Sequence, residues 1–75
     1  IQPVIEINNG RIALRTREKS LSVVRDIYEI KSIEKYGEDN LVFIFEDEKF
    51  NVLIKHIKDE ELTAVINFIS ESKEI

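Results

Sequence analysis

No cysteine occurs among the 75 residues of this chain. A domain of this length lies near the lower limit at which a hydrophobic core alone supports folding, and many small domains rely on disulfides or metals instead. The missing thiols exclude disulfides, thiolate metal ligands and a cysteine nucleophile. We therefore expect one domain, residues 1–75, whose stability comes from its hydrophobic core.

The apolar residues of that core favour β-structure. Thirteen Ile and six Val outnumber five Leu, four Phe and two Ala. β-Branched side chains lose rotamer freedom in helices but pack well on a pleated sheet. One Pro and two Gly are too few for a linker or a disordered chain. The composition therefore predicts a folded domain rich in strands.

The first third of the chain predicts a β-hairpin followed by a third strand. Val4–Ile7 is β-branched, and Asn8-Asn9-Gly10 is a turn signal because Asn and Gly tolerate positive φ. In Arg11–Thr16, Ile and Leu alternate with Arg and Ala, which is the period of a half-buried strand. After a polar connection, Leu21–Arg25 is interpreted as the third strand.

Residues 21–37 allow two interpretations. Apolar residues recur at every third position: Leu21, Val24, Ile27, Ile30 and Ile33. A helix that ends at Gly37 would explain this spacing. However, a spacing of three drifts around a helix of 3.6 residues per turn, and the β-branched content opposes a helix. We favour strands, with a kink near Asp26-Ile27 and a fourth strand over Glu29–Tyr36, and keep the helix as the alternative.

The second half of the chain predicts two more strands and a helix. Leu41–Phe45 is a continuous apolar run, typical of a strand covered on both faces, and Phe50–Ile57 follows an acidic turn. Asp59 is expected to cap a helix whose first turn carries Glu60 and Glu61. The apolar stripe of this helix lies at i, i+3, i+4 and i+7: Leu62, Val65, Ile66 and Ile69.

These elements together predict an α+β fold. We expect an antiparallel sheet, or a partly open β-barrel or roll, of about six strands with one C-terminal α-helix. Strands linked by hairpins pair antiparallel, and a single helix must cover one face or one open end of the sheet. Core packing is expected for all four Phe residues: Phe43, Phe45, Phe50 and Phe68.

The order of these elements resembles the pleckstrin-homology (PH)-like superfold, and in particular the short PH-like modules of small bacterial membrane proteins. Four stretches carry the resemblance: Pro3–Ile12, Val24–Ile30, the pair of strands Leu41–Phe45 and Phe50–Ile54, and the helix start Asp59–Leu62. The resemblance implies a non-catalytic module at the cytoplasmic face of a membrane, next to transmembrane helices. The chain begins at Ile1 and lacks Met, so we expect it to be excised from a longer protein.

The net charge of −4 argues against nucleic acid as a partner, because phosphate binding needs a surplus of Lys and Arg. The charge is nevertheless uneven along the chain. Residues 1–35 hold seven basic and five acidic side chains, for +2, and residues 36–75 hold four basic and ten acidic ones, for −6. No apolar run approaches the roughly 20 residues that span a bilayer.

The sequence indicates no enzyme, no cofactor and no metal site. His56 is the only histidine, and catalysis would require partners that orient it. The acidic clusters Glu46–Glu48 and Asp59–Glu61 lack the alternating ligands and the Gly of a calcium loop. We interpret the first as a solvated turn and the second as a helix N-terminus.

Two sets of residues are candidates for binding. The first is a basic stripe that would contact anionic lipid or another anion: Arg11, Arg15, Arg17, Lys19 and Arg25. In PH domains the loop between the first two strands commonly supplies such cations, whereas the matching loop here, Asn8-Asn9-Gly10, is neutral. The second set comprises Tyr28 and Tyr36, which would contact protein if they are exposed together with Phe50.

These observations rank three functions. The first is a PH-like interaction module that acts through protein contacts or self-association, with an exposed edge strand as another docking element. The second is binding to an anionic membrane surface through the basic stripe. The third is an accessory or regulatory domain of an enzyme whose catalytic part lies elsewhere.

Overall fold

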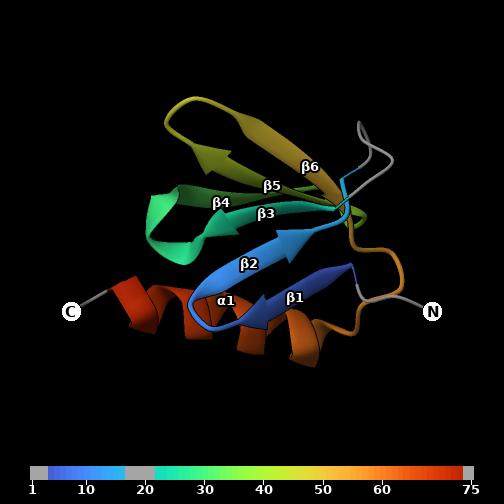
Figure 1. The fold of residues 1–75 in the computed structure, drawn as a ribbon. Coiled ribbons are helices and arrows are strands. Elements are labelled where there is room, and N and C mark those ends of the chain that lie inside the picture. The colour runs from blue at the N-terminus through green and yellow to red at the C-terminus, as the bar shows by residue number, and fades with distance from the viewer. Residues whose placement is uncertain (1–3, 17–21, 74–75) are drawn as a thin grey trace.

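The computed structural model describes residues 4–16 and 22–73, and it has the predicted α+β fold (Figure 1). Six strands are followed by one helix. In chain order the elements are β1 (Ile5–Asn8), β2 (Arg11–Leu14), β3 (Val23–Asp26), the 3₁₀ turn η1 (Ile27–Glu29), β4 (Ile30–Tyr36), β5 (Asn40–Phe45), β6 (Lys49–Leu53) and α1 (Asp59–Lys73). The prediction of six strands and a C-terminal α-helix is confirmed.

The strands form two antiparallel sheets. The N-terminal sheet has the order β1-β2-β3, and the C-terminal sheet has the order β4-β5-β6. Outside the named strands, a bridge between Thr16 and Val52 joins the two sheets. The helix α1 runs below β1 (Figure 1) and lines a shallow groove with β1 and another with β4. It therefore covers the opening between one edge of each sheet, and the roll is open rather than closed.

The hairpin predicted at Asn9-Gly10 is confirmed. Asn9 has φ 53° and Gly10 has φ 76°, which are the two positive values that a two-residue type I′ turn needs. The turn sets the register of β1 and β2, so that Asn8 pairs with Arg11 and Ile7 with Ile12.

The strand interpretation of residues 22–36 is also confirmed, and Leu21 lies outside the described residues. The chain bends at η1, where the Asp26 carboxylate accepts a hydrogen bond of 3.2 Å from the Tyr28 N–H. β4 then begins at Ile30, one residue later than predicted. The bend moves the chain from the N-terminal sheet to the C-terminal sheet.

Two boundaries and the burial of one strand differ from the sequence predictions. β6 ends at Leu53 instead of Ile57, because the chain turns after Ile54, whose carbonyl accepts a hydrogen bond from the Ile57 N–H. Asp59 is the first residue of α1 and not its cap, since the Lys58 carbonyl accepts from the Leu62 N–H. β5 is not covered on both faces: its burial alternates, and Val42 and Ile44 are half-buried on the outer face.

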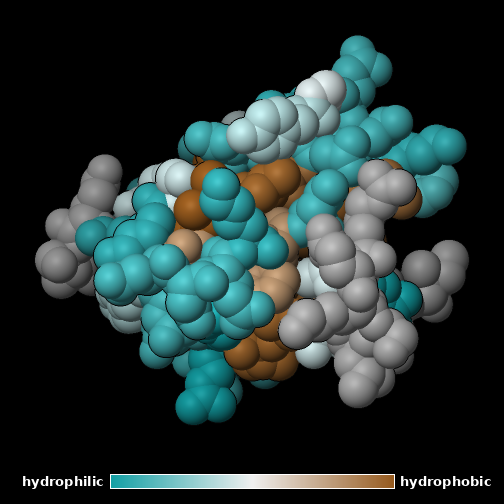
Figure 2. Space-filling model, turned by 90° about the horizontal axis from the view of Figure 1, so that it is seen from above, coloured by the Kyte–Doolittle hydropathy of each residue, from teal (hydrophilic) through white to brown (hydrophobic). Residues whose placement is uncertain are grey.

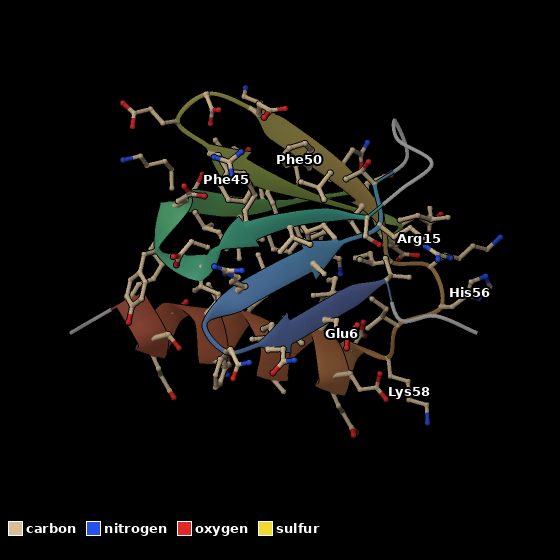
Figure 3. The ribbon with its side chains drawn as sticks, viewed as in Figure 1. Glu6, Arg15, Phe45, Phe50, His56 and Lys58 are labelled. Carbon is tan, nitrogen blue, oxygen red and sulfur yellow. The ribbon has the colours of Figure 1, made fainter. Side chains whose placement is uncertain are left out.

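The core lies between the two sheets and α1. Phe45 and Phe50 pack edge-to-face there, with ring centroids 5.6 Å apart (Figure 3). All its members are almost fully buried: Ile12, Leu14, Ile27, Ile30, Leu41, Phe43, Phe45, Phe50, Val52, Ile54, Leu62 and Ile69. The predicted helix stripe reaches this core, with Val65 and Ile66 half-buried beside Leu62 and Ile69. One expectation is wrong, because Phe68 is 51% exposed.

Candidate functional site

The basic stripe does not form one surface, because β2 and β3 turn its members to different sides. The outer face of the N-terminal sheet carries six side chains in two cross-strand rows: Asn8, Arg11 and Asp26 in one, and Glu6, Ala13 and Val24 in the other. Arg25 instead pairs with the buried Ile12, so it faces the inside of the roll. Arg11 and Arg25 therefore lie on opposite sides of the sheet.

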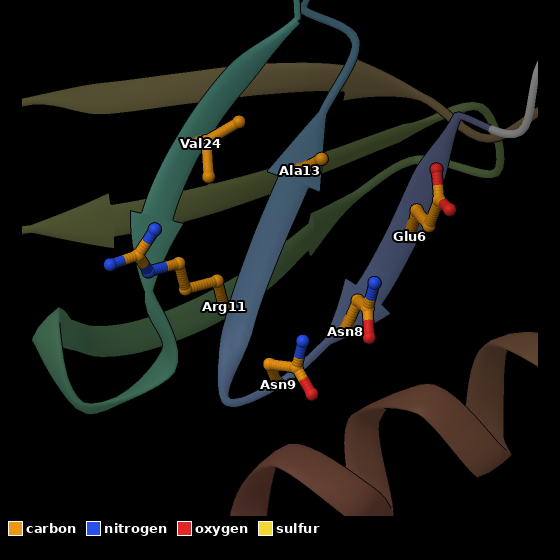
Figure 4. Close-up of a pocket in the computed structure, with 6 residues that line it drawn as sticks. All are labelled: Glu6, Asn8, Asn9, Arg11, Ala13 and Val24. Carbon is orange, nitrogen blue, oxygen red and sulfur yellow. The ribbon is translucent and has the colours of Figure 1, made fainter.

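The outer face of the N-terminal sheet is hollow but not strongly basic. Figure 4 shows Arg11 and Glu6 among the side chains around an open depression of about 520 Å³. The small Ala13 forms part of its lining and Val24 is 56% exposed at its side. Arg11 is the cation of this lining and Glu6 is its anion, so their formal charges cancel.

Arg25 belongs to an ion cluster of four residues, the Arg25 cluster: Arg25, Glu29, Asp47 and Glu48. Its Nε lies 2.8 Å from Glu29 Oε2, and its two terminal nitrogens lie 3.0 Å from Asp47 Oδ1 and 3.4 Å from Glu48 Oε1. The guanidinium carbon is 4.5 Å from the ring centroid of Phe45. The Arg25 guanidinium, which was a candidate for contact with anionic lipid, thus already contacts three carboxylates and an aromatic ring.

The pKa values in the Arg25 cluster follow from these contacts. The hydrogen bonds to Glu29 and Asp47 raise the pKa of Arg25 further above its usual range. The reciprocal hydrogen bond lowers the pKa of the Asp47 carboxyl. The ion pair of Arg25 and Asp47 is therefore favoured in the fold, and it links the end of β3 to the turn between β5 and β6.

The remaining members of the basic stripe lie at or beyond the end of β2. Arg15 is exposed, its N–H donates to the Val4 carbonyl at 2.9 Å, and it lies at the same end of the molecule as His56 (Figure 3). Arg17 and Lys19 lie outside the described residues. The structure thus places Arg11 and Arg15 on β2 and its continuation, and separates Arg25 from them.

The two tyrosines are both exposed but lie far apart. Tyr28 is 63% exposed on η1 and Tyr36 is 55% exposed at the last residue of β4. β4 has seven residues, so at about 3.3 Å per residue it separates them by roughly 20 Å. Phe50 is 3% exposed. The expected patch of Tyr28, Tyr36 and Phe50 therefore does not exist as one surface.

Tyr36 lies on the outer face of the C-terminal sheet, away from Tyr28, with its own set of neighbouring side chains. It pairs with Asn40, which pairs in turn with Leu53, so the three side chains form one row. Its hydroxyl donates a hydrogen bond to the Glu34 carboxylate. This bond and the negative charge of Glu34 raise the pKa of Tyr36, because both disfavour the phenolate.

An apolar groove between β1 and α1, the β1–α1 groove, was not predicted. It is lined by Ile7, Ala64, Val65 and Phe68 and has a volume of about 280 Å³. The face of the molecule seen from above has another apolar area, bordered by polar side chains (Figure 2). One signal in the sequence marks the groove: Phe68 stands between Leu62, Val65, Ile66 and Ile69 and the acidic positions of the helix, at the border of the apolar stripe.

Metal ligands and the single histidine are placed as follows. Residues 4–16 and 22–73 contain no group of three His, Cys, Asp or Glu side chains that is arranged to hold a metal ion. His56 is exposed in the connection between β6 and α1. In the same part of the chain, no helix has the length and apolar character needed to cross a membrane.

Comparison with known proteins adds no relative: no family model, curated protein or solved structure matches the chain. Its function is therefore argued from its own surfaces.

Proposed function

We propose that this chain is a non-catalytic, PH-like interaction module that acts by contact with another protein. The β1–α1 groove carries this proposal, because it leaves Phe68 51% exposed beside three further apolar side chains. Single exposed apolar residues are common on protein surfaces, but an aromatic residue in a continuous apolar depression is typical of an interface anchor. Burying the Phe68 ring against a partner would remove its apolar surface from water, which favours binding.

The fold supports the PH-like part of the proposal. Six strands in two antiparallel sheets and one C-terminal helix are the elements that the resemblance implies. The proposed setting, at the cytoplasmic side of a bacterial membrane protein, rests on the resemblance alone.

Lipid binding is the weaker proposal because of where the cations lie. An anionic membrane attracts basic side chains that are clustered on one face, with each adding about 1 kcal/mol. Arg25 faces three carboxylates, and Arg11 pairs with Asp26 across the strands. Arg25 therefore does not share a face with Arg11 and Arg15, so the described part of the basic stripe offers a membrane two cations instead of three.

Site-specific photocrosslinking would test the protein-contact function. A photoreactive phenylalanine analogue is placed at position 68 of the protein expressed in its own organism, and the matched control carries the analogue at position 63. Thr63 is exposed on the same helix but is not part of the lining of the groove. We expect a protein adduct from position 68 and none from position 63.

Flotation with neutral and anionic vesicles separates the lipid function from the protein-contact function. We expect no flotation at physiological salt. Salt-sensitive flotation with anionic vesicles only, lost in the double variant Arg11→Glu and Arg15→Glu, together with no adduct from position 68, would contradict the proposal and favour lipid binding.

A further inference from the structure

We infer, on the basis of the function proposed above, that the partner seated in the β1–α1 groove is a basic protein segment that carries an apolar anchor residue. The inference comes from the charges that surround the groove on the surface of α1.

The exposed face of α1 places carboxylates at both ends of the groove. Glu61, Ala64, Phe68 and Glu71 lie at i, i+3, i+7 and i+10, so they share one face of the helix. All four are exposed. Glu60 lies on the same side, four residues before Ala64. The apolar part of the groove is therefore bracketed along the helix by three negative charges.

The basic residue of α1, Lys73, points away from the β1–α1 groove. Lys73 is the basic residue of the last turn, and its Nζ donates to the Ile30 carbonyl at the start of β4. β4 lies on the other side of α1 from β1, since Ile30, Ile66, Ile69 and Lys73 line a separate groove. Lys73 therefore does not neutralise the carboxylates beside Phe68.

The negative charges around the β1–α1 groove favour some binding partners over others. A second copy that presents the same face would bring Glu61 and Glu71 against like charges, and an anionic membrane would be repelled in the same way. The volume of about 280 Å³ lies just below the roughly 300–1,000 Å³ of typical small-molecule sites. A peptide segment with Lys or Arg on either side of an apolar side chain fits both features: the apolar side chain packs in the groove, and the basic side chains pair with the carboxylates at its rim, Glu60, Glu61 and Glu71.

Short synthetic peptides provide the test with the purified chain. The first peptide alternates Lys with Leu and Phe, the second replaces Lys by Glu, and the third replaces the apolar residues by Ser. Affinity is measured by fluorescence anisotropy, and the bound surface is mapped by ¹⁵N chemical-shift changes. We expect binding of the first peptide only, with shifts concentrated at Ile7, Ala64, Val65 and Phe68.

Variants separate the roles of the anchor and the rim. Phe68→Ser should weaken binding of the first peptide by about tenfold or more, as for a central aromatic anchor. Glu61→Gln and Glu71→Gln should each weaken it by about two- to fivefold and flatten its salt dependence. The matched controls are Tyr28→Ser, another exposed aromatic residue but outside the groove, and Glu38→Gln, an exposed acid in the turn before β5. Neither control should change the affinity.

The outcomes distinguish this inference from the function on which it rests. Equal binding of the basic and acidic peptides, no binding of either, or shifts outside the groove would overturn the inference. If position 68 still crosslinks to a protein whose captured segment is neutral or acidic, the interaction function stands and only the basic partner is wrong. Self-association in sedimentation velocity that is lost in Phe68→Ser would identify a second copy as the occupant and overturn the inference.

Discussion

Arg11 and Arg25 face opposite sides of the N-terminal sheet, although both belong to the basic stripe in the sequence. Arg11 pairs with the exposed Asp26, whereas Arg25 pairs with the buried Ile12 and reaches across to Phe45. The two arginines should therefore respond differently to the same substitution.

Arg25→Gln should lower the stability of the fold. The substitution removes the ion pair with Glu29 on η1. It also removes the contacts with Asp47, Glu48 and Phe45, which connect the N-terminal sheet to the C-terminal one. We expect the Tm to fall by roughly 5 °C. Arg11→Gln is the matched control and should leave the Tm nearly unchanged. Arg25→Lys should retain only part of the effect, because an ammonium group cannot engage three carboxylates in fixed directions. Equal Tm values for the Arg25→Gln and Arg11→Gln variants would show that the Arg25 cluster contributes nothing.

Stability should fall in acid partly through Asp47. Arg25 lowers the pKa of Asp47 in the folded state, so the stabilisation is present above the unfolded pKa of about 3.9 and is lost as the pH falls through the lower folded value. Urea unfolding of the wild type and of Asp47→Asn should therefore differ at pH 7 and converge in strong acid. A difference between the two proteins that does not shrink with falling pH would rule out this linkage.

Tyr36 should lose its proton at a higher pH than an ordinary tyrosine does. The hydrogen bond to Glu34 and its charge raise the pKa of Tyr36 above 10.0, so the bond stabilises the fold below the unfolded pKa and is lost as the pH rises through the folded value. The chain has two tyrosines, and Tyr28→Phe leaves Tyr36 alone for ultraviolet titration. Adding Glu34→Gln should return the pKa towards 10.0, and an unchanged titration curve would disprove the role of Glu34.

Truncation to Ala should lower the stability of the fold much more at Phe43 than at Phe68. Phe43 is 0% exposed and Phe68 is 51% exposed. Phe43→Ala should cost about 3–5 kcal/mol, a large share of the roughly 4–11 kcal/mol expected for 75 residues. Phe68→Ala should cost about 1 kcal/mol or less, which leaves a folded protein for binding experiments. Denaturant unfolding measures both values, and comparable losses would mean that Phe68 belongs to the core.

Local sequence signals predicted most of the fold. Asn9-Gly10 is a turn because of its own backbone preferences, and the bend at Asp26 uses the N–H of Tyr28, two residues away. The helix follows from the spacing of Leu62, Val65 and Ile69. In each case the interactions that decide the structure lie within a few residues of one another.

The features that escaped prediction depend on distant residues. Arg25 is removed from the basic stripe by Asp47 and Glu48, which are 22 and 23 residues away. The exposure of Phe68 depends on how α1 is rotated against β1. None of these relations is visible in local spacing.

The arrangement of each sheet from three consecutive strands has a consequence for how the chain folds. Every strand pairs only with its neighbour in sequence, so each hairpin closes a short loop at a small entropic cost. The two halves can zip independently within microseconds to milliseconds. We expect the docking of the two halves to be the slow step, because the contacts that join them, such as the Thr16–Val52 bridge and the Arg25 cluster, link residues far apart in the sequence.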